Sequence, residues 1–76
     1  MNITDFEYHY HLVAYSYDKG EDDKNDCPNF TKAKVWAKQW LKEGWEKVTI
    51  YKVFTTCTLM VAEVTKEGIR RITNND

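Results

Sequence analysis

The sequence predicts a small single α+β domain in which one helix packs on a three-stranded sheet. Three observations predict this fold class. The chain has 76 residues, which is enough for one domain. One segment has the apolar spacing of an amphipathic helix, and three segments have the composition of strands. Their order along the chain is strand, helix, strand, strand, so residues 1–76 are expected to form one β-α-β-β domain.

The first strand is expected at residues 8–17, which are rich in aromatic and branched side chains and contain no glycine or proline. Successive side chains of a strand point to opposite faces of the sheet. One face of this strand carries Tyr8, Tyr10, Leu12, Ala14 and Ser16, and the other carries His9, His11, Val13, Tyr15 and Tyr17. Each face is partly apolar, so we expect both faces to be partly covered.

A flexible acidic loop is expected at residues 18–29. The segment contains Gly20 and Pro28, which favour loops, and its five acidic residues outnumber its two lysines by three. An irregular connection of this length is typical of a mobile or functional loop. Its acidic residues could meet a cation or a partner, but their spacing is not that of a calcium-binding EF-hand loop.

A helix is expected from Thr31 to Glu43. Thr31 is a suitable N-cap, because its hydroxyl can accept a hydrogen bond from a backbone N–H group of the first turn. Phe30 would then precede the cap and form a hydrophobic staple with Val35. Helical spacing gathers the apolar side chains on one stripe, namely Phe30, Ala33, Trp36, Ala37, Trp40 and Leu41. This stripe, with both of its tryptophans, is expected to be buried against the sheet.

The end of the helix is expected at Gly44. Glycine adopts the left-handed conformation of the position after a helix without strain. Lys38 and Lys42 place positive charge near the negative end of the helix dipole. Trp45 would then contact Trp40, which is the hydrophobic contact of a Schellman motif.

Two further strands are expected at residues 46–54, which alternate charged and branched side chains, and at residues 57–65. The second of these contains the apolar run 59–62, which is typical of a central strand covered on both faces. We therefore expect it to lie between the other two strands and antiparallel to both. This is the order 1-3-2 of a split β-α-β arrangement. Residues from about 69 to 76 are expected to form a frayed tail.

The composition excludes several classes of protein. Hydrophobic residues make up 42% of the chain and charged residues 30%, which is too apolar for a disordered protein. The net charge of −1 gives no overall attraction to nucleic acid or membrane. No apolar run approaches the roughly 20 residues of a membrane span, and no signal peptide is visible. We therefore expect a cytoplasmic protein with no membrane partner, in which Cys27 and Cys57 are reduced thiols.

Candidate catalytic and metal-binding residues are few. His9 and His11 lie on one face of the first strand and could hold Zn²⁺ or Cu²⁺ if a third ligand such as Cys57 came close. The sequence contains no glycine-rich phosphate loop and no G-x-S-x-G motif. We therefore expect no catalytic residue, no metal and no cofactor. A small metal-dependent enzyme built on the two histidines is the second alternative.

A basic row lies on the expected helix, because Lys34, Lys38 and Lys42 recur every four residues on the side away from the apolar stripe. Such a row can follow the phosphates of a nucleic acid, contact a protein or simply be solvated. Binding of nucleic acid or a nucleotide, through these lysines or an aromatic sheet face, is therefore the first alternative function.

The middle of the chain resembles many small bacteriophage accessory proteins. The resemblance rests on Phe30-Thr31, on Trp36-Ala37-Lys38 and on the run LKEGWEKVTIYKV at residues 41–53. These residues match a capped helix that ends in Glu-Gly-aromatic, followed by a Val-x-Val-Tyr-Lys-like strand. The resemblance implies a phage-encoded protein of the host-takeover or anti-defence type, which acts in the host cytoplasm. No functional residue carries over, and the acidic loop and the first strand depart from the pattern.

The leading prediction is a non-enzymatic protein-binding module that inhibits a bacterial host or defence protein. One helix can cover only one side of three strands, so the other side should expose aromatic side chains and favour a homodimer. The expected partner-binding residues are Tyr8, Tyr10, Tyr15, Tyr17, Asp22, Asp23, Asp26, Lys34, Lys38 and Lys42.

Overall fold

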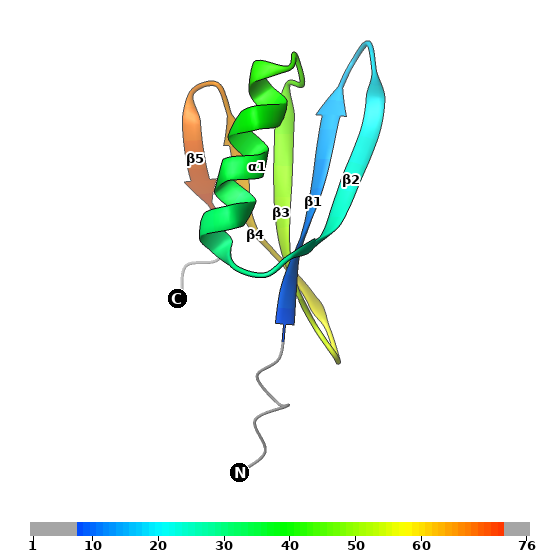
Figure 1. The fold of residues 1–76 in the computed structure, drawn as a ribbon, viewed down its shortest axis with the longest axis vertical. Coiled ribbons are helices and arrows are strands. Elements are labelled where there is room, and N and C mark those ends of the chain that lie inside the picture. The colour runs from blue at the N-terminus through cyan, green and yellow to red at the C-terminus, as the bar shows by residue number, and fades with distance from the viewer. Residues whose placement is uncertain (1–7, 73–76) are drawn as a thin grey trace.

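A computed structural model describes residues 8–72, which form one helix and five strands (Figure 1). The strands are β1 (Tyr8–Ser16), β2 (Gly20–Cys27), β3 (Lys47–Phe54), β4 (Thr58–Thr65) and β5 (Gly68–Arg71), and the helix is α1 (Phe30–Lys42). The strands form one antiparallel sheet in the order β2-β1-β3-β4-β5. The class is α+β, but the predicted three-stranded split β-α-β sheet in the order 1-3-2 is wrong.

The largest difference is β2, which occupies the segment expected as a flexible acidic loop. A three-residue turn follows Ser16, and the chain returns at Gly20, whose φ of +88° lies in the left-handed region that glycine tolerates. At the other end of β2, Cys27 is 1% exposed and pairs with Tyr10 of β1. Pairing with β1 and burial of Cys27 therefore outweigh the low strand propensity of the acidic residues between them.

The central strand is β3, which pairs with β1 on one side and β4 on the other. The apolar run in β4 has a cause other than the predicted coverage on both faces. A register shift relative to β3 leaves Val61 as an extra residue, so Val61 and Ala62 are both buried although they are adjacent. Leu59 and Met60, before this bulge, are 45% and 40% exposed. The run therefore marks a bulge and not a strand covered on both faces.

The expected frayed tail contributes a fifth strand instead. β5 follows a turn at Lys66 and Glu67 and pairs antiparallel with β4, so that Arg71 lies opposite Ala62. Beyond β5, the Ile72 backbone N–H donates a hydrogen bond of 3.0 Å to the Val61 carbonyl. The last part of the predicted tail, residues 73–76, lies outside the described residues.

The start of α1 lies close to its expected place but uses a different cap. Asn29 is the N-cap, and its Oδ1 accepts a hydrogen bond of 2.9 Å from the Lys32 backbone N–H. Phe30 is therefore the first helical residue, and Thr31 does not cap the helix. The predicted staple is also wrong, because Val35 is 63% exposed on the outside of α1.

The end of α1 confirms the predicted Schellman motif. Gly44 has a φ of +104°, and its N–H donates to the Leu41 carbonyl at 3.2 Å. The Trp45 N–H donates to the Trp40 carbonyl at 3.1 Å, and the two indole rings lie 6.4 Å apart between centroids. The Lys19 ammonium, from the turn after β1, adds a hydrogen bond of 2.6 Å to the Glu43 carbonyl.

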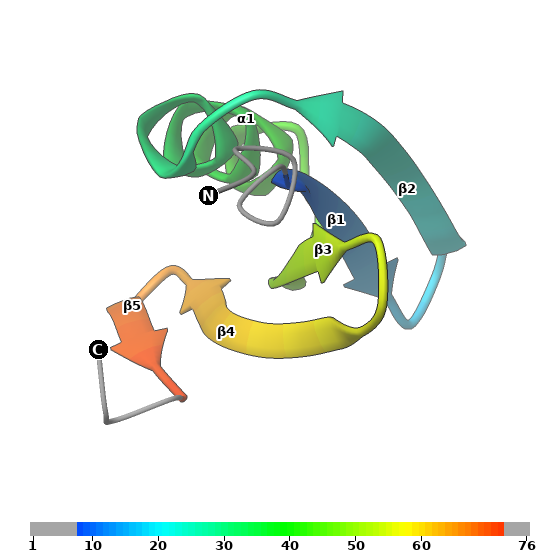
Figure 2. The same ribbon diagram turned by 90° about the horizontal axis from the view of Figure 1, so that it is seen from below.

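The core lies between α1 and one face of the sheet (Figure 2). Trp40 is 7% exposed, as predicted, but Trp36 is 41% exposed and lies at the margin of the helix contact. The helix contributes two alanines, Ala33 and Ala37, that allow its backbone to approach the strands closely. The fully buried sheet side chains are Leu12, Ala14, Cys27, Val48, Ile50, Ala62 and Val64.

Candidate functional site

Two surfaces of the sheet are not covered by α1. We call the side opposite the helix the helix-free face. Its members are His9, His11, Val13, Tyr15, Glu21, Asp23, Asn25, Lys47, Thr49, Tyr51, Val53, Met60, Glu63 and Arg70.

The second surface is on the helix side, beside the first turn of α1, where the start of β1 and the β3–β4 hairpin extend past the helix (Figure 1). We call it the aromatic–cation cluster, and its members are Tyr8, Tyr10, Phe30, Phe54, Lys34, Lys52 and Arg71.

The helix-free face follows from the alternation of β1. The residues of β1 from Tyr10 to Ser16 that face the helix are buried, and His9, His11, Val13 and Tyr15 alternate with them. The register with β3 places Tyr51 beside His11 and Thr49 beside Val13. The sequence therefore assigned residues 8–16 to the correct sides of this strand, whereas Tyr17, which was expected on the histidine side, lies in the turn beyond it.

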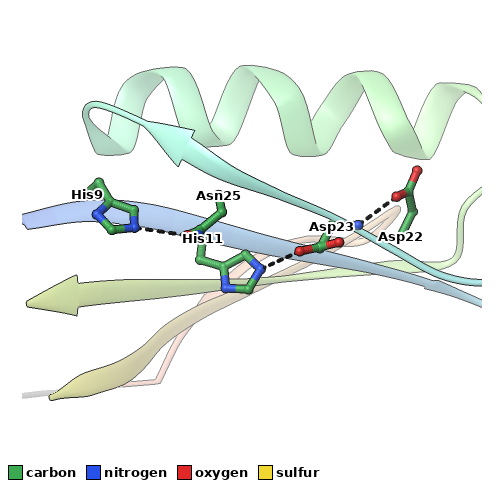
Figure 3. A network of polar contacts seen from close by, with 5 residues as sticks. All are labelled: His9, His11, Asp22, Asp23 and Asn25. Carbon is green, nitrogen blue, oxygen red and sulfur yellow. Dashed lines mark hydrogen bonds and ion pairs between the residues drawn. The ribbon is translucent and has the colours of Figure 1, made fainter.

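The histidines of the helix-free face are bonded to β2. His9 Nε2 donates a hydrogen bond of 2.9 Å to Asn25 Oδ1, and His11 Nε2 lies 2.9 Å from Asp23 Oδ2 (Figure 3). The His11 ring also lies 6.2 Å from the Tyr51 ring between centroids. Each histidine thus has its own partner on the neighbouring strand, and the pairs hold β2 against β1.

The histidines do not form the metal centre that was considered from the sequence. Among the residues that the structure describes, no group of three or more His, Cys, Asp or Glu side chains could hold a metal ion. Cys57, the suggested third ligand, is exposed in the turn that joins β3 to β4. The arrangement of the two histidines is that of two separate cross-strand pairs.

Shallow depressions mark the centre of the helix-free face. One has a volume of about 290 Å³ and lies over Val13, Tyr15, Tyr51 and Met60, with the charged residues Glu21, Lys47 and Glu63 around it. A second, of about 270 Å³, continues it toward His11 and Asp23. Such shallow, open depressions are suited to side chains of another protein rather than to an enclosed small substrate.

Charge is distributed unevenly across the helix-free face. The β2 side carries Glu21 and Asp23, whereas the β5 side carries Arg70. Between them, Glu63 accepts a hydrogen bond of 2.9 Å from Arg70 and lies 3.8 Å from the Lys47 ammonium. The face therefore has an apolar centre with an acidic side at β2 and, toward β5, an ion-paired cluster in which Glu63 lies between Lys47 and Arg70.

The aromatic–cation cluster is a connected set of rings. Tyr8 lies 5.7 Å from Tyr10 in an edge-to-face arrangement and 5.6 Å from Phe54. Tyr10 lies 5.8 Å from Phe30 at the start of α1. The set continues the core outward, from Tyr10 at 7% exposure to Tyr8 at 43%.

Three cations lie over these rings. The Lys52 ammonium is 4.1 Å from the Tyr8 centroid and 5.4 Å from that of Phe54. The Arg71 guanidinium and the Lys34 ammonium are 4.7 Å and 5.3 Å from the Phe30 centroid. All of these distances are within the range of cation–π attraction.

The predicted tyrosines divide between surfaces. Tyr8 and Tyr10 belong to the helix side, Tyr15 belongs to the helix-free face, and Tyr17 is 83% exposed in the turn after β1. Burial, with a smaller contribution from the neighbouring Tyr8, raises the pKa of Tyr10, and the nearby Arg71 opposes this shift. The four predicted tyrosines therefore do not share one surface.

The predicted charged residues are also dispersed. Asp23 is on the helix-free face, Asp22 pairs with Ala14 on the opposite side of β2, and Asp26 forms a 3.0 Å salt bridge with Lys24. The basic row on α1 is present, with Lys34 in the aromatic–cation cluster and Lys38 and Lys42 exposed beyond it. Helix α1 carries four lysines and no acidic residue, whereas β2 carries four acidic residues and one lysine.

Sequence reasoning missed the residues that β3 and β4 contribute. Tyr51 and Met60 lie at the centre of the helix-free face, and Lys52 and Phe54 belong to the cluster. The alternation in residues 46–54 separates these side chains correctly into two sets. Only the pairing of β3 with β1 reveals which set lies beside the histidines and which beside Tyr8.

The two cysteines are free thiols in different environments. Cys27 is buried at the end of β2, and Cys57 is exposed. Burial raises the pKa of the Cys27 thiol above its ordinary value of 9.0, while the nearby Lys24 partly opposes the shift. Cys27 therefore acts as a small apolar side chain of the core.

Comparison with known proteins identifies no relative, because no family model, no curated protein and no solved structure matches the chain. Helix α1, the one helix within residues 8–72, lacks the length and apolar character that a membrane crossing requires.

Proposed function

We propose that the protein is a non-enzymatic module that binds a protein partner through the helix-free face. The observation that supports this most directly is the apolar centre of that face, which no described element covers. Tyr15 and Met60 there are 39% and 40% exposed, and Val13, Tyr51 and Val53 are half-buried beside them. Aromatic residues and methionine within a polar rim are typical of protein interfaces.

The target predicted from the sequence, a bacterial host or defence protein that the module inhibits, is part of this proposal. Its support is the resemblance of residues 30–53 to small phage accessory proteins. The phage origin and the cytoplasmic location of the complex have the same support.

A second copy of the chain is one protein that would fit this face. A two-fold axis between the copies and parallel to the strands would place the acidic β2 side of one copy opposite the basic β5 side of the other. The acidic side of each copy would then meet the cluster of Lys47, Glu63 and Arg70, which has one net positive charge, and the apolar centres would meet. We therefore propose a homodimer in which the helix-free faces of two copies meet across this two-fold axis.

The test compares two matched double variants. Tyr15→Thr with Tyr51→Thr removes aromatic area from the helix-free face and keeps strand propensity. Tyr17→Thr with Val35→Thr removes apolar area elsewhere. We expect the wild type and the second variant, used as bait in bacterial lysate, to retain the same protein, which the first variant loses. Equal capture by both variants would contradict the proposal.

Sedimentation of the same three proteins examines self-association separately. A dimer that only the Tyr15→Thr, Tyr51→Thr variant loses would identify the second copy as the occupant of the helix-free face. A monomer of 9.0 kDa in all three samples would exclude the homodimer and leave the face to a foreign protein.

A further inference from the structure

We infer that the aromatic–cation cluster, together with the lysine row of α1, binds single-stranded nucleic acid. This surface lies on the helix side of the sheet and shares no residue with the helix-free face, so the inference is independent of the proposed function. It concerns a second ligand, of different chemistry, at a second site.

The rings supply the first requirement, which is a platform for bases. Single-strand-binding proteins stack unpaired bases on exposed aromatic side chains, with little preference for sequence. Tyr8 is 43% exposed, and its ring is held by contacts with Tyr10 and Phe54. Tyr10 is itself buried and lies against Phe30. The exposed ring is therefore supported from beneath and already oriented before a base arrives.

The cations supply the second requirement, which is positive charge beside the rings. The Lys52 ammonium, 4.1 Å from the Tyr8 centroid, lies where it can move to a phosphate while a base takes its place on the ring. Lys34 is held at Phe30 in the same way, 5.3 Å from the centroid. Within residues 8–72, neither lysine forms a salt bridge, so neither has to leave a carboxylate in order to meet a phosphate.

The basic charge extends away from the rings along α1. Lys34 is followed at helical four-residue spacing by Lys38 and Lys42, and both are exposed. Helix α1 itself contains four lysines and no acidic residue. It therefore carries a local positive surface that the net charge of −1 conceals.

The combination of rings and cations favours a single strand over two other polyanions. Bases of a duplex are stacked on one another and cannot lie on Tyr8 without being unpaired. An acidic peptide would use the lysines but not the rings. A single strand uses both, because each nucleotide carries one phosphate and one base.

The experiment measures the fluorescence anisotropy of a labelled oligothymidylate of about 16 nucleotides, within the site size of small single-strand binders. Titrations with the full chain are carried out at roughly 50 and 200 mM NaCl, because phosphate contacts weaken with salt. We expect wild-type binding to weaken with salt. The slope of log affinity against log salt is negative, and Lys34→Gln with Lys52→Gln should reduce its magnitude by about 1.4.

The matched control removes the same charge elsewhere. Lys47→Gln with Lys66→Gln changes one lysine on the helix-free face and one in the β4–β5 turn, and it should leave the slope unchanged. Circular dichroism confirms that both double variants are folded. If the magnitude of the salt slope fell equally in both double variants, the binding would be general charge attraction, and the inference would be overturned.

The contribution of the ring is measured at Tyr8. Tyr8→Leu keeps apolar bulk but removes the stacking surface, and it should weaken binding by about tenfold. Tyr8→Phe keeps the ring and should bind as the wild type does. Three results would each overturn the inference. These are failure of the wild type to bind the oligomer, binding of the oligomer by Tyr8→Leu as tightly as by the wild type, and competition for the site by polyglutamate as strong as that by a nucleic acid.

Discussion

The two faces of the sheet are built from the same strands but are organised by different forces. On the helix side, Leu12 and Ile50 are completely buried beneath α1. On the other side, their neighbours His11 and Tyr51 contact one another at the surface, and His11 bonds to Asp23. Packing density decides which side chains fit the first face, whereas the second needs only compatible cross-strand pairs. The helix-side face therefore carries the stability, and the helix-free face can be adapted to binding.

The largest effect should come from the helix side at Trp40. Trp40→Ala would leave a large cavity between α1 and the sheet, and we expect it to lower the free energy of unfolding by about 3–5 kcal/mol. Urea unfolding followed by circular dichroism measures the change. Trp36→Ala is the control, because Trp36 is 41% exposed and its loss should cost less than half as much. A Trp40→Ala protein within about 1 kcal/mol of wild type would show that this contact is not part of the core.

Substitutions at two adjacent residues of β1 compare the stability contributions of the two faces most directly. Leu12→Ala should lower the free energy of unfolding by about 2–5 kcal/mol, since its side chain is fully buried. Val13→Ala, on the helix-free face, should lower it by about 1 kcal/mol or less. The same unfolding experiment applies to both. Equal losses would mean that the helix-free face is covered in solution, as it would be in a dimer, and repeating the measurement at higher protein concentration would reveal this.

Alkaline pH should lower the free energy of unfolding through Cys27 and Tyr10 on the helix side, because burial raises the pKa of both groups. The unfolded chain loses these protons first, so their contribution to stability is complete below the ordinary pKa values of 9.0 and 10.0. It is lost as the pH rises through those values toward the higher pKa values of the folded protein. Unfolding at about pH 8 and about pH 10.5 measures the loss. Cys27→Ala with Tyr10→Phe should reduce this loss, and an unchanged loss would contradict the assignment.

The smallest effect is expected on the helix-free face at the pair of His11 and Asp23. Asp23→Asn removes a charge from an exposed cross-strand pair, and such pairs contribute roughly 0.2–1 kcal/mol to the free energy of unfolding. Glu67→Gln, in the β4–β5 turn, is a control that removes a carboxylate charge without affecting this pair. A loss above about 2 kcal/mol would show that the pair organises β2 far more than its exposure indicates.

The sequence by itself determined the features that depend on neighbours a few residues away. The helix lies within one residue of its predicted start and end, because the apolar stripe and Gly44 act locally. The Schellman contact between Trp40 and Trp45 follows from the same glycine. The alternation of β1, with its histidines on one side and Leu12 on the other, follows from the geometry of any strand.

Only the tertiary structure decided which strands exist at the edges and how they are ordered. The acidic residues of β2 do not favour a strand, and they adopt one because Cys27 pairs with the distant Tyr10. β5 forms in the same way, by pairing with β4 across a two-residue turn. Both candidate sites depend on these pairings, since the register of β1 with β3 brings Tyr51 to His11 and Lys52 to Tyr8. Strand pairing joins residues that are far apart in sequence, and strand propensity varies with that context, so local patterns could not determine the sheet order.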